Sequence, residues 1–190
     1  MNEIAIKMKE TDDILDRTNK LLINSRGVLV FNELYELWFV KVFQYTYVRV
    51  GNNTDAEDLV SEIFLKVYES FSRYKHRGSF PAWLFTIARN EIRMFYRWKK
   101  KLGVDIDTIS ITDPAEDMLK SAIDSSDLDK LNSTIKKLSE DERELLNLRY
   151  VAEMRFSDMA LVLKKREDAV KKSLYRLQAR MQKDMEVNYE

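Results

Sequence analysis

The chain has 190 residues, enough for one large or two small domains, and its 32 basic residues balance its 32 acidic ones. Hydrophobic residues make up 45% and charged residues 34%, which allows a buried core under a polar surface. Only 4 Gly and 2 Pro are present, which favours helices over hairpins. The absence of Cys excludes a disulfide framework, a thiolate metal site and a Cys nucleophile. With no signal-peptide core and no apolar run of about 18 residues, we expect a cytoplasmic protein without direct membrane insertion.

The zero net charge hides three blocks of opposite sign. Residues 89–101 carry six bases and one acid, residues 102–129 carry eight acids and one base, and residues 164–183 carry eight bases and two acids. Electrostatic fields reach only about 8–10 Å in physiological salt, so each block acts mainly on its own surroundings. The charge of each block therefore indicates possible binding partners better than the net charge of the chain does. Two basic regions flank an acidic one.

Helical periodicity begins near the N-terminus. The extension 1–27 holds a predicted short helix over 12–23, which we interpret as an accessory element. Residues 28–50 are dense in aromatic residues and Val at helical spacing, and predict a helix buried on a broad face. The sequence Gly-Asn-Asn at 51–53 then breaks the chain.

A strongly amphipathic helix is predicted over 54–74, with Thr54 or Asp55 as its cap. Its apolar arc repeats every three or four residues. The opposite side gathers Asp58, Glu62 and Leu65. A Leu surrounded by carboxylates suits protein docking, but an ordinary solvated helix has the same pattern, and both interpretations stay open.

Residues 77–101, RGSFPAWLFTIARNEIRMFYRWKKK, predict a loop followed by a long helix. Ser79 suits the N-cap, and Pro81 fits the first turn because its missing N–H costs nothing there. We expect one arc to be buried: Trp83, Leu84, Ile87, Ala88, Met94, Phe95 and Trp98. The other side carries a basic stripe that fits a phosphate backbone, or else a solvated surface: Arg89, Arg93, Arg97 and Lys100. The sequence does not explain Glu91, which falls within the apolar arc.

The C-terminal part predicts a helix-turn-helix after a linker. Residues 102–129 have the composition of a linker, and helices resume over 130–190. Ser139 and Glu142 form a predicted capping box, and Ser157 a second N-cap. A short helix, a tight turn at Lys164 and a last helix with a basic outer face complete the motif. Lys164 stands near the usual Gly of the turn, and we expect Lys to adopt this turn without a positive φ.

Three segments together resemble the sigma-70 family, and most closely its extracytoplasmic-function group. DAEDLVSEIFLKVYESFSRY (55–74) is similar to the group's polymerase-binding helix, and RGSFPAWLFTIARN (77–90) to its loop and helix for the −10 promoter element. LSEDERELLNLRYVAEMRFSDMALVLKKREDAVKKSLYRLQARM (138–181) is similar to its −35 domain. The resemblance covers roughly 28–101 and 131–183.

The resemblance implies an all-α protein with two helical domains, joined by an acidic flexible linker. The domains would be region 2 over 28–101, for polymerase core and the −10 element, and region 4 over 130–190, a helix-turn-helix for the −35 element. The linker 102–129 would mimic nucleic acid in the polymerase's RNA path, or serve as a plain tether.

The same resemblance implies a promoter-specificity subunit of RNA polymerase that is not itself an enzyme and needs no metal or cofactor. Its expected partners are RNA polymerase core, promoter DNA and, since the family often has one, an anti-sigma factor. The alternatives are a stand-alone helix-turn-helix regulator, a helical interaction protein that does not bind DNA and, with least support, a hydrolytic nuclease. Binding to polymerase core separates the sigma interpretation from all three.

Candidate site residues follow from the matched segments. Those expected to contact polymerase are Asp55, Asp58, Glu62 and Leu65. Those expected at the −10 element, where phosphate contacts position and a flipped base is held, are Lys75, Arg77, Ser79, Phe80, Trp83, Arg89, Asn90, Arg93 and Arg97. Those expected at the −35 element are Arg166, Glu167, Asp168, Lys171, Lys172, Tyr175 and Arg176. Glu167 and Asp168 equally suit a helix N-terminus for electrostatic reasons alone.

Overall fold

The computed structural model describes residues 3–24, 28–74, 79–102, 133–135 and 137–186. Within these ranges the chain is helical and contains no strand, which confirms the predicted fold class. The elements are α1 (Glu3–Asn24), α2 (Val28–Val50), α3 (Asn53–Phe71), α4 (Phe80–Lys101), α7 (Glu140–Leu146), the π-helical turn η2 (Asn147–Val151), α8 (Phe156–Leu163) and α9 (Glu167–Glu186). The predicted linker lies almost wholly outside the described residues.

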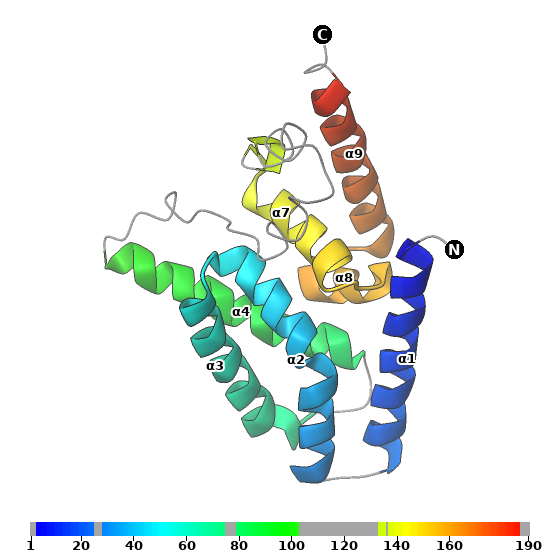
Figure 1. Cartoon of the computed structure of the whole chain (residues 1–190), viewed down its shortest axis with the longest axis vertical. Helices are drawn as coiled ribbons and strands as arrows, with labels where there is room; N and C mark the ends of the chain where they lie inside the picture. The colour runs from blue at the N-terminus through cyan, green and yellow to red at the C-terminus, as the bar shows by residue number, and fades with distance from the viewer. Residues whose placement is uncertain (1–2, 25–27, 75–78, 103–132, 136, 187–190) are drawn as a thin grey trace.

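Helix α2 is the centre of the N-terminal helices, α1–α4. It packs against α1, α3 and α4, and α4 crosses behind it in the view of Figure 1. The Trp38 and Phe85 rings meet edge to face at 6.2 Å, and the Tyr45 ring meets Phe85 in the same way at 5.1 Å. All three side chains are fully buried. Each contributes roughly 1.5–3 kcal/mol or more through its apolar area, so α2 and α4 are held together over two helical turns.

The caps of the N-terminal helices agree only in part with prediction. Ser79 caps α4 as predicted, because its hydroxyl accepts from the Ala82 N–H at 3.3 Å. The cap of α3 is neither Thr54 nor Asp55 but Asn52, whose side-chain oxygen accepts from the Asp55 N–H at 2.8 Å. The chain break that precedes it is confirmed, since Gly51 has a φ of 81°.

The apolar arc predicted on α4 is wrong at its C-terminal end. Met94 is 49% exposed and Trp98 is 60% exposed, because α4 extends beyond the helices that cover its first half. Glu91, unexplained by the sequence, is buried and forms an ion pair with Lys66 of α3. The pair satisfies a carboxylate that would otherwise be costly to bury.

The C-terminal helices, α7–α9 with η2, form a helix-turn-helix. The capping box of Ser139 and Glu142 starts α7 as predicted. Ser157, by contrast, does not cap α8: the N-cap is Arg155, and no side chain caps this helix. Val170, Leu174 and Leu177 of α9 are buried at helical spacing, while Met181 is only partly covered.

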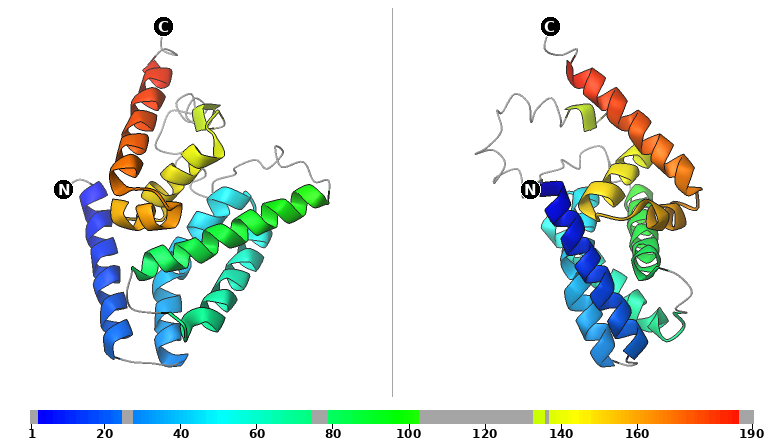
Figure 2. Two further views of the ribbon diagram at one scale, coloured as in Figure 1. Left: turned by 180° about the vertical axis from the view of Figure 1, so that it is seen from behind. Right: turned by 90° about the vertical axis from the view of Figure 1, so that its right-hand side faces the viewer.

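The two groups of helices pack against each other. Helix α8 lies beside the N-terminal half of α4, and η2 lies against α2 (Figure 2, left). Helix α1 is longer than predicted and runs along α2, with its N-terminal end near α8 (Figure 1). None of the described helices is long and apolar enough to cross a membrane.

The tight turn of the helix-turn-helix contains a strained residue. Lys164 ends α8 with φ 54° and ψ 42°, so the expectation of a turn without a positive φ is wrong. A side chain in this left-handed region costs about 1 kcal/mol, which Gly does not incur.

We predict that Lys164→Gly raises the free energy of unfolding by about 0.5–1 kcal/mol, because relief of the strain outweighs the added freedom of the unfolded chain. The matched control is Lys165→Gly, since the φ of Lys165 is not positive and Gly there only adds freedom. Urea denaturation of the three proteins measures the effect. Equal destabilisation by both substitutions would show that Lys164 is not strained.

Candidate nucleic-acid interface

The outer face of α3 presents the predicted docking residues to solvent. Leu65 is 57% exposed, and Asp58 and Glu62 are exposed near it. Tyr68, one turn further along, extends this face and was not predicted from the sequence. An apolar centre flanked by carboxylates and a Tyr has the composition of a protein-binding surface.

Asp55 is engaged within the molecule. Its carboxylate accepts from Asn52 and forms an ion pair with Lys99 near the end of α4. Burial alone would raise the pKa of Asp55, but these hydrogen bonds and the Lys99 charge hold it below the usual range. Asp55 therefore ties α3 to α4 and differs from the other three predicted docking residues.

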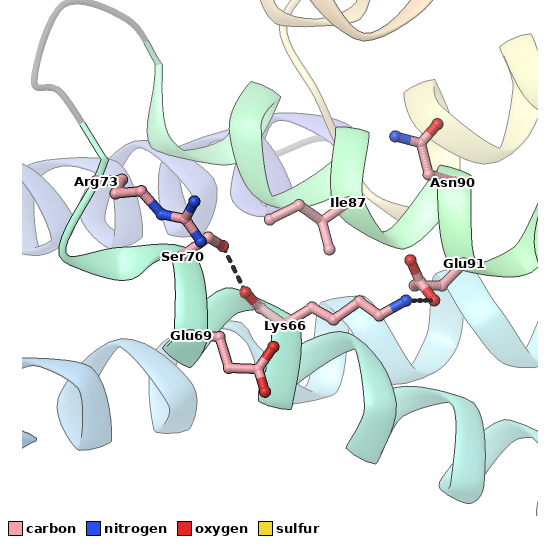
Figure 3. Close-up of a pocket in the computed structure, with 7 residues that line it drawn as sticks. All are labelled: Lys66, Glu69, Ser70, Arg73, Ile87, Asn90 and Glu91. Atoms are coloured by element: carbon pink, nitrogen blue, oxygen red, sulfur yellow. Dashed lines mark hydrogen bonds and ion pairs between the residues drawn. The ribbon is translucent and has the colours of Figure 1, made fainter.

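A cleft between α3 and α4 collects polar side chains from both helices (Figure 3). Lys66 reaches across it to Glu91, while Arg73 and Asn90 line its opposite ends. Asn90 was a predicted site residue; Lys66 and Arg73 were not. Lys66 and Arg73 are seven residues apart and so fall on one face of the helix predicted over 54–74, although α3 ends at Phe71; this spacing was the available sequence signal.

A second groove lies at the start of α4, and we call it the α4 groove. It is lined by Arg73, Tyr74, Ser79, Ala82, Trp83, Thr86 and, from α8, Leu161. The predicted residue Trp83 packs against the Tyr74 ring at 4.7 Å, whereas Phe80 is buried beneath it. The predicted residues Lys75 and Arg77 lie outside the described residues. The groove thus has an aromatic wall and a cation, features that suit a nucleobase and its phosphate.

Helix α8 covers one side of the α4 groove. Leu161 lines it, and the Asp158 carboxylate is hydrogen-bonded to the Ser79 side chain. Burial raises the pKa of Asp158, and the Ser79 hydrogen bond and the Arg155 charge only partly offset that rise. Ser79 is therefore occupied by α8 in this arrangement.

A buried carboxylate joins the two groups of helices. Glu144 of α7 is only 3% exposed at its side chain and meets three groups of the N-terminal helices. The Tyr45 hydroxyl donates to it at 2.7 Å, Arg49 donates a charged hydrogen bond, and the Arg89 Nε lies 3.3 Å away in ion-pair contact without hydrogen-bond geometry. We call these four residues the Glu144 cluster. Burial, followed by the Glu144 charge, raises the pKa of Tyr45 well above its usual value.

The basic stripe of α4 is divided by this cluster. Arg89 faces Glu144 with most of its side chain covered, whereas Arg93 and Arg97 are exposed. Only the outer part of the predicted phosphate-binding stripe is therefore accessible in this arrangement.

The predicted −35 residues lie together on the outer side of α9 and its preceding turn. Arg166, Asp168, Lys172, Tyr175 and Arg176 are exposed. Glu167 and Lys171 form an ion pair at 2.7 Å, which raises the pKa of Lys171. The surface offers donors and acceptors at the start of the helix and cations further along.

Comparison with known proteins identifies the family of the chain. The family model "Sigma-70 region 2" matches residues 34–102. The extracytoplasmic-function sigma factor BldN of Streptomyces coelicolor is 30% identical over 77% of this chain, a match that covers 56% of BldN. SigX of Bacillus subtilis is 24% identical over 83% of this chain and 84% of its own length. The chain belongs to the extracytoplasmic-function group of the sigma-70 family.

Solved sigma-factor structures share the fold. CnrH, in complex with the cytosolic domain of CnrY, aligns with a TM-score of 0.63 and 21% identity over 90% of this chain and 95% of that one. RpoE of Bartonella quintana, in complex with the anti-sigma factor NepR, aligns with a TM-score of 0.64 and 24% identity over 84% and 99%. In this sigma factor, no group of three or more His, Asp or Glu among the described residues could hold a metal ion.

The Glu144 cluster gives a direct test of the contact between the two groups of helices. We predict that Glu144→Gln lowers the free energy of unfolding by about 3 kcal/mol, because it removes the ion-pair partner of the covered Arg89 and leaves Arg49 with the exposed Glu140 as its partner. The matched control is Glu140→Gln on the same helix. Glu140 also pairs with Arg49, at 3.2 Å, but its side chain is 69% exposed, so its loss costs under about 1 kcal/mol. Urea denaturation compares the two, and equal losses would contradict a special role for Glu144.

Proposed function

We propose that this sigma factor is the promoter-specificity subunit of an RNA polymerase. It binds the polymerase core and directs initiation by recognising the −10 and −35 elements and helping to melt the former. The observation that carries the proposal is the composition of the helices α3 and α4. Within the segment matched by the region 2 family model, they combine an exposed docking face with a groove suited to a nucleotide.

At the −10 element, the α4 groove is proposed to hold an unstacked base. Flipping a base costs a few kcal/mol of lost stacking, which an aromatic wall can offset by about 1–3 kcal/mol per stacked base. Trp83 and Tyr74 supply this wall, and Arg73 supplies a cation for the adjacent phosphate. Exposed Arg93 and Arg97 would then position the strand along α4 without reading its sequence.

At the −35 element, α9 is proposed to enter the major groove of duplex DNA. In such docking, residues at the start of the recognition helix reach the bases, and later residues meet the backbone. Glu167 can accept from cytosine N4, and Lys171 or Lys172 can donate to guanine O6 and N7. The pairing of Glu167 with Lys171 presents an acceptor and a donor side by side.

The contact between the two groups of helices is proposed to form when the protein is not bound to polymerase. Ser79 and Arg89, both expected at the −10 element, are engaged by Asp158 and Glu144. The contact must therefore open before DNA can use them, and core binding would supply the free energy. An anti-sigma factor is a further proposed partner, since the aligned RpoE structure contains one.

The proposal is tested by transcription in vitro with purified core polymerase and a pool of genomic promoters. The expected result is a discrete set of transcripts that appears only when both core and this chain are present. Binding of the chain to specific DNA, with no effect on core transcription, would instead indicate a stand-alone regulator.

The docking face on α3 generates a specific prediction. Leu65→Lys is expected to weaken binding to core polymerase by at least about tenfold, because a charge replaces an apolar contact at the centre of the face. Val40→Lys on α2 is the matched control, since Val40 is 58% exposed and lies outside this face. Pull-down of core measures both, with circular dichroism to confirm unchanged helicity. If Val40→Lys weakens binding and Leu65→Lys does not, the docking surface lies elsewhere.

Two substitutions on α9 are predicted to distinguish a residue that reads bases from a residue that positions the helix on DNA. Lys171→Ala should cost about 1–3 kcal/mol on the preferred −35 sequence and less on others, which relaxes one position. Arg176→Ala should weaken binding about equally on all sequences and reduce the salt slope by roughly one unit. Holoenzyme binding to a randomised −35 library at two salt concentrations measures both effects. A reversed pattern would show that α9 enters the groove in a different orientation.

A further inference from the structure

Helix α1 touches both groups of helices, although it precedes the segment that the family model matches. It runs along α2, and its N-terminal end comes near α8 and the turn before it (Figures 1 and 2). It is thus placed to hold the C-terminal helices on the N-terminal ones.

The attachment of α1 to α2 is buried. The Trp38 indole N–H donates to the Thr18 hydroxyl at 3.0 Å, and this hydroxyl donates to the Ile14 carbonyl at 2.7 Å. Leu22 is buried in the same core, and Ile14 and Leu15 pack against it. This half of α1 is therefore a fixed part of the N-terminal helices.

Two polar contacts join α1 to the turn between η2 and α8. The Thr11 hydroxyl donates to the Glu153 carboxylate at 2.7 Å and accepts from Lys41 of α2 at 3.1 Å. Lys41 also forms an ion pair with Glu153, so α1, α2 and the turn meet at one partly buried point. Beside it, Arg155 at the start of α8 donates to the Asp12 carboxylate at 2.5 Å.

The turn that α1 contacts has an unfavourable backbone conformation. Glu153 has a φ of 53°, in the left-handed region that residues with a side chain avoid. Surrounding contacts must stabilise such a residue. The contacts of the Glu153 carboxylate with Thr11 and Lys41 stabilise this backbone conformation. They thereby place Arg155 opposite Asp12.

We propose that α1 is an intramolecular clamp, which acts through Thr11 and Asp12. It stabilises the arrangement in which α7–α9 pack against α1–α4, which we call the closed arrangement. The Glu144 cluster closes the contact from the side of α7, and α1 closes it from the side of the turn before α8. Displacement of the first half of α1 would free Arg155 from Asp12 and remove the Thr11 hydrogen bond from Glu153. Glu153 would keep its ion pair with Lys41 of α2. The loss of both α1 contacts would favour separation of α8 from the α4 groove. The clamp concerns the isolated chain, so it holds whether or not the proposed function is correct.

Distances between spin labels test the clamp. The chain has no Cys, so Glu57→Cys on α3 and Lys183→Cys on α9 give two exposed labelling sites in the full-length protein. Thr11→Val with Asp12→Lys removes both polar contacts and places a cation opposite Arg155. A short distance between the labels reports the closed arrangement, and a long distance reports separated helices. We expect the ratio of the long-distance population to the short-distance population to rise roughly three- to tenfold.

Two further variants control this experiment. Asp13→Lys makes the same charge change at the neighbouring exposed position and should leave the distances unchanged. Adding Arg155→Glu to Asp12→Lys reverses the ion pair and should return most of the population to the short distance. Unchanged distances in the double variant would overturn the clamp. The clamp would also be overturned if the reversed pair did not restore the short distances while circular dichroism showed intact helicity. That result would show that Asp12 does not act through Arg155.

Discussion

The arrangement of this sigma factor depends on one carboxylate that is buried between two groups of helices. Glu144 leaves water to meet the Tyr45 hydroxyl and two guanidinium groups, of Arg49 and Arg89. Burying a charge is favourable only when partners replace its hydration, so Glu144 and its partners stabilise one another only while the contact is closed. A contact of this kind is sensitive to small changes, because opening it restores water to all the charges at once. It can therefore hold the two groups of helices together and still be released by a partner that binds either group.

The closed contact bears directly on function. The α4 groove offers an aromatic wall and a cation, but α8 supplies one of its lining residues, Leu161, and occupies Ser79 through Asp158. The outward surfaces, by contrast, are accessible: Leu65 on α3 and Arg176 on α9 are both exposed. The surface proposed for core polymerase is thus available in the closed state, while that proposed for the melted −10 strand is partly covered. This difference would make productive DNA contact follow core binding.

The sequence predicted local features well and contacts between distant segments poorly. The amphipathic face of α3, the Ser79 cap and the Ser139 capping box depend on residues within a few positions of one another, and all three are confirmed. Periodicity could not show that α4 extends past its neighbours, and so Trp98 was wrongly placed in the core. Nor could it identify the partners of Glu91, Arg89 and Glu144, because Lys66 is 25 positions from Glu91, and Glu144 is 99 from Tyr45. A helix surface pattern gives the direction of a side chain but not the identity of what covers it.

The central claim is that the Glu144 contact restricts access to the −10 surface of the isolated protein. The most direct measurement is the affinity of the isolated full-length chain for single-stranded, non-template −10 DNA from a promoter that it activates with core. Fluorescence anisotropy would compare the unmodified protein with Glu144→Gln and Glu140→Gln. The account predicts weak binding by the unmodified protein and by Glu140→Gln, and binding at least about tenfold tighter by Glu144→Gln. Equal affinity of all three proteins for this DNA would contradict it.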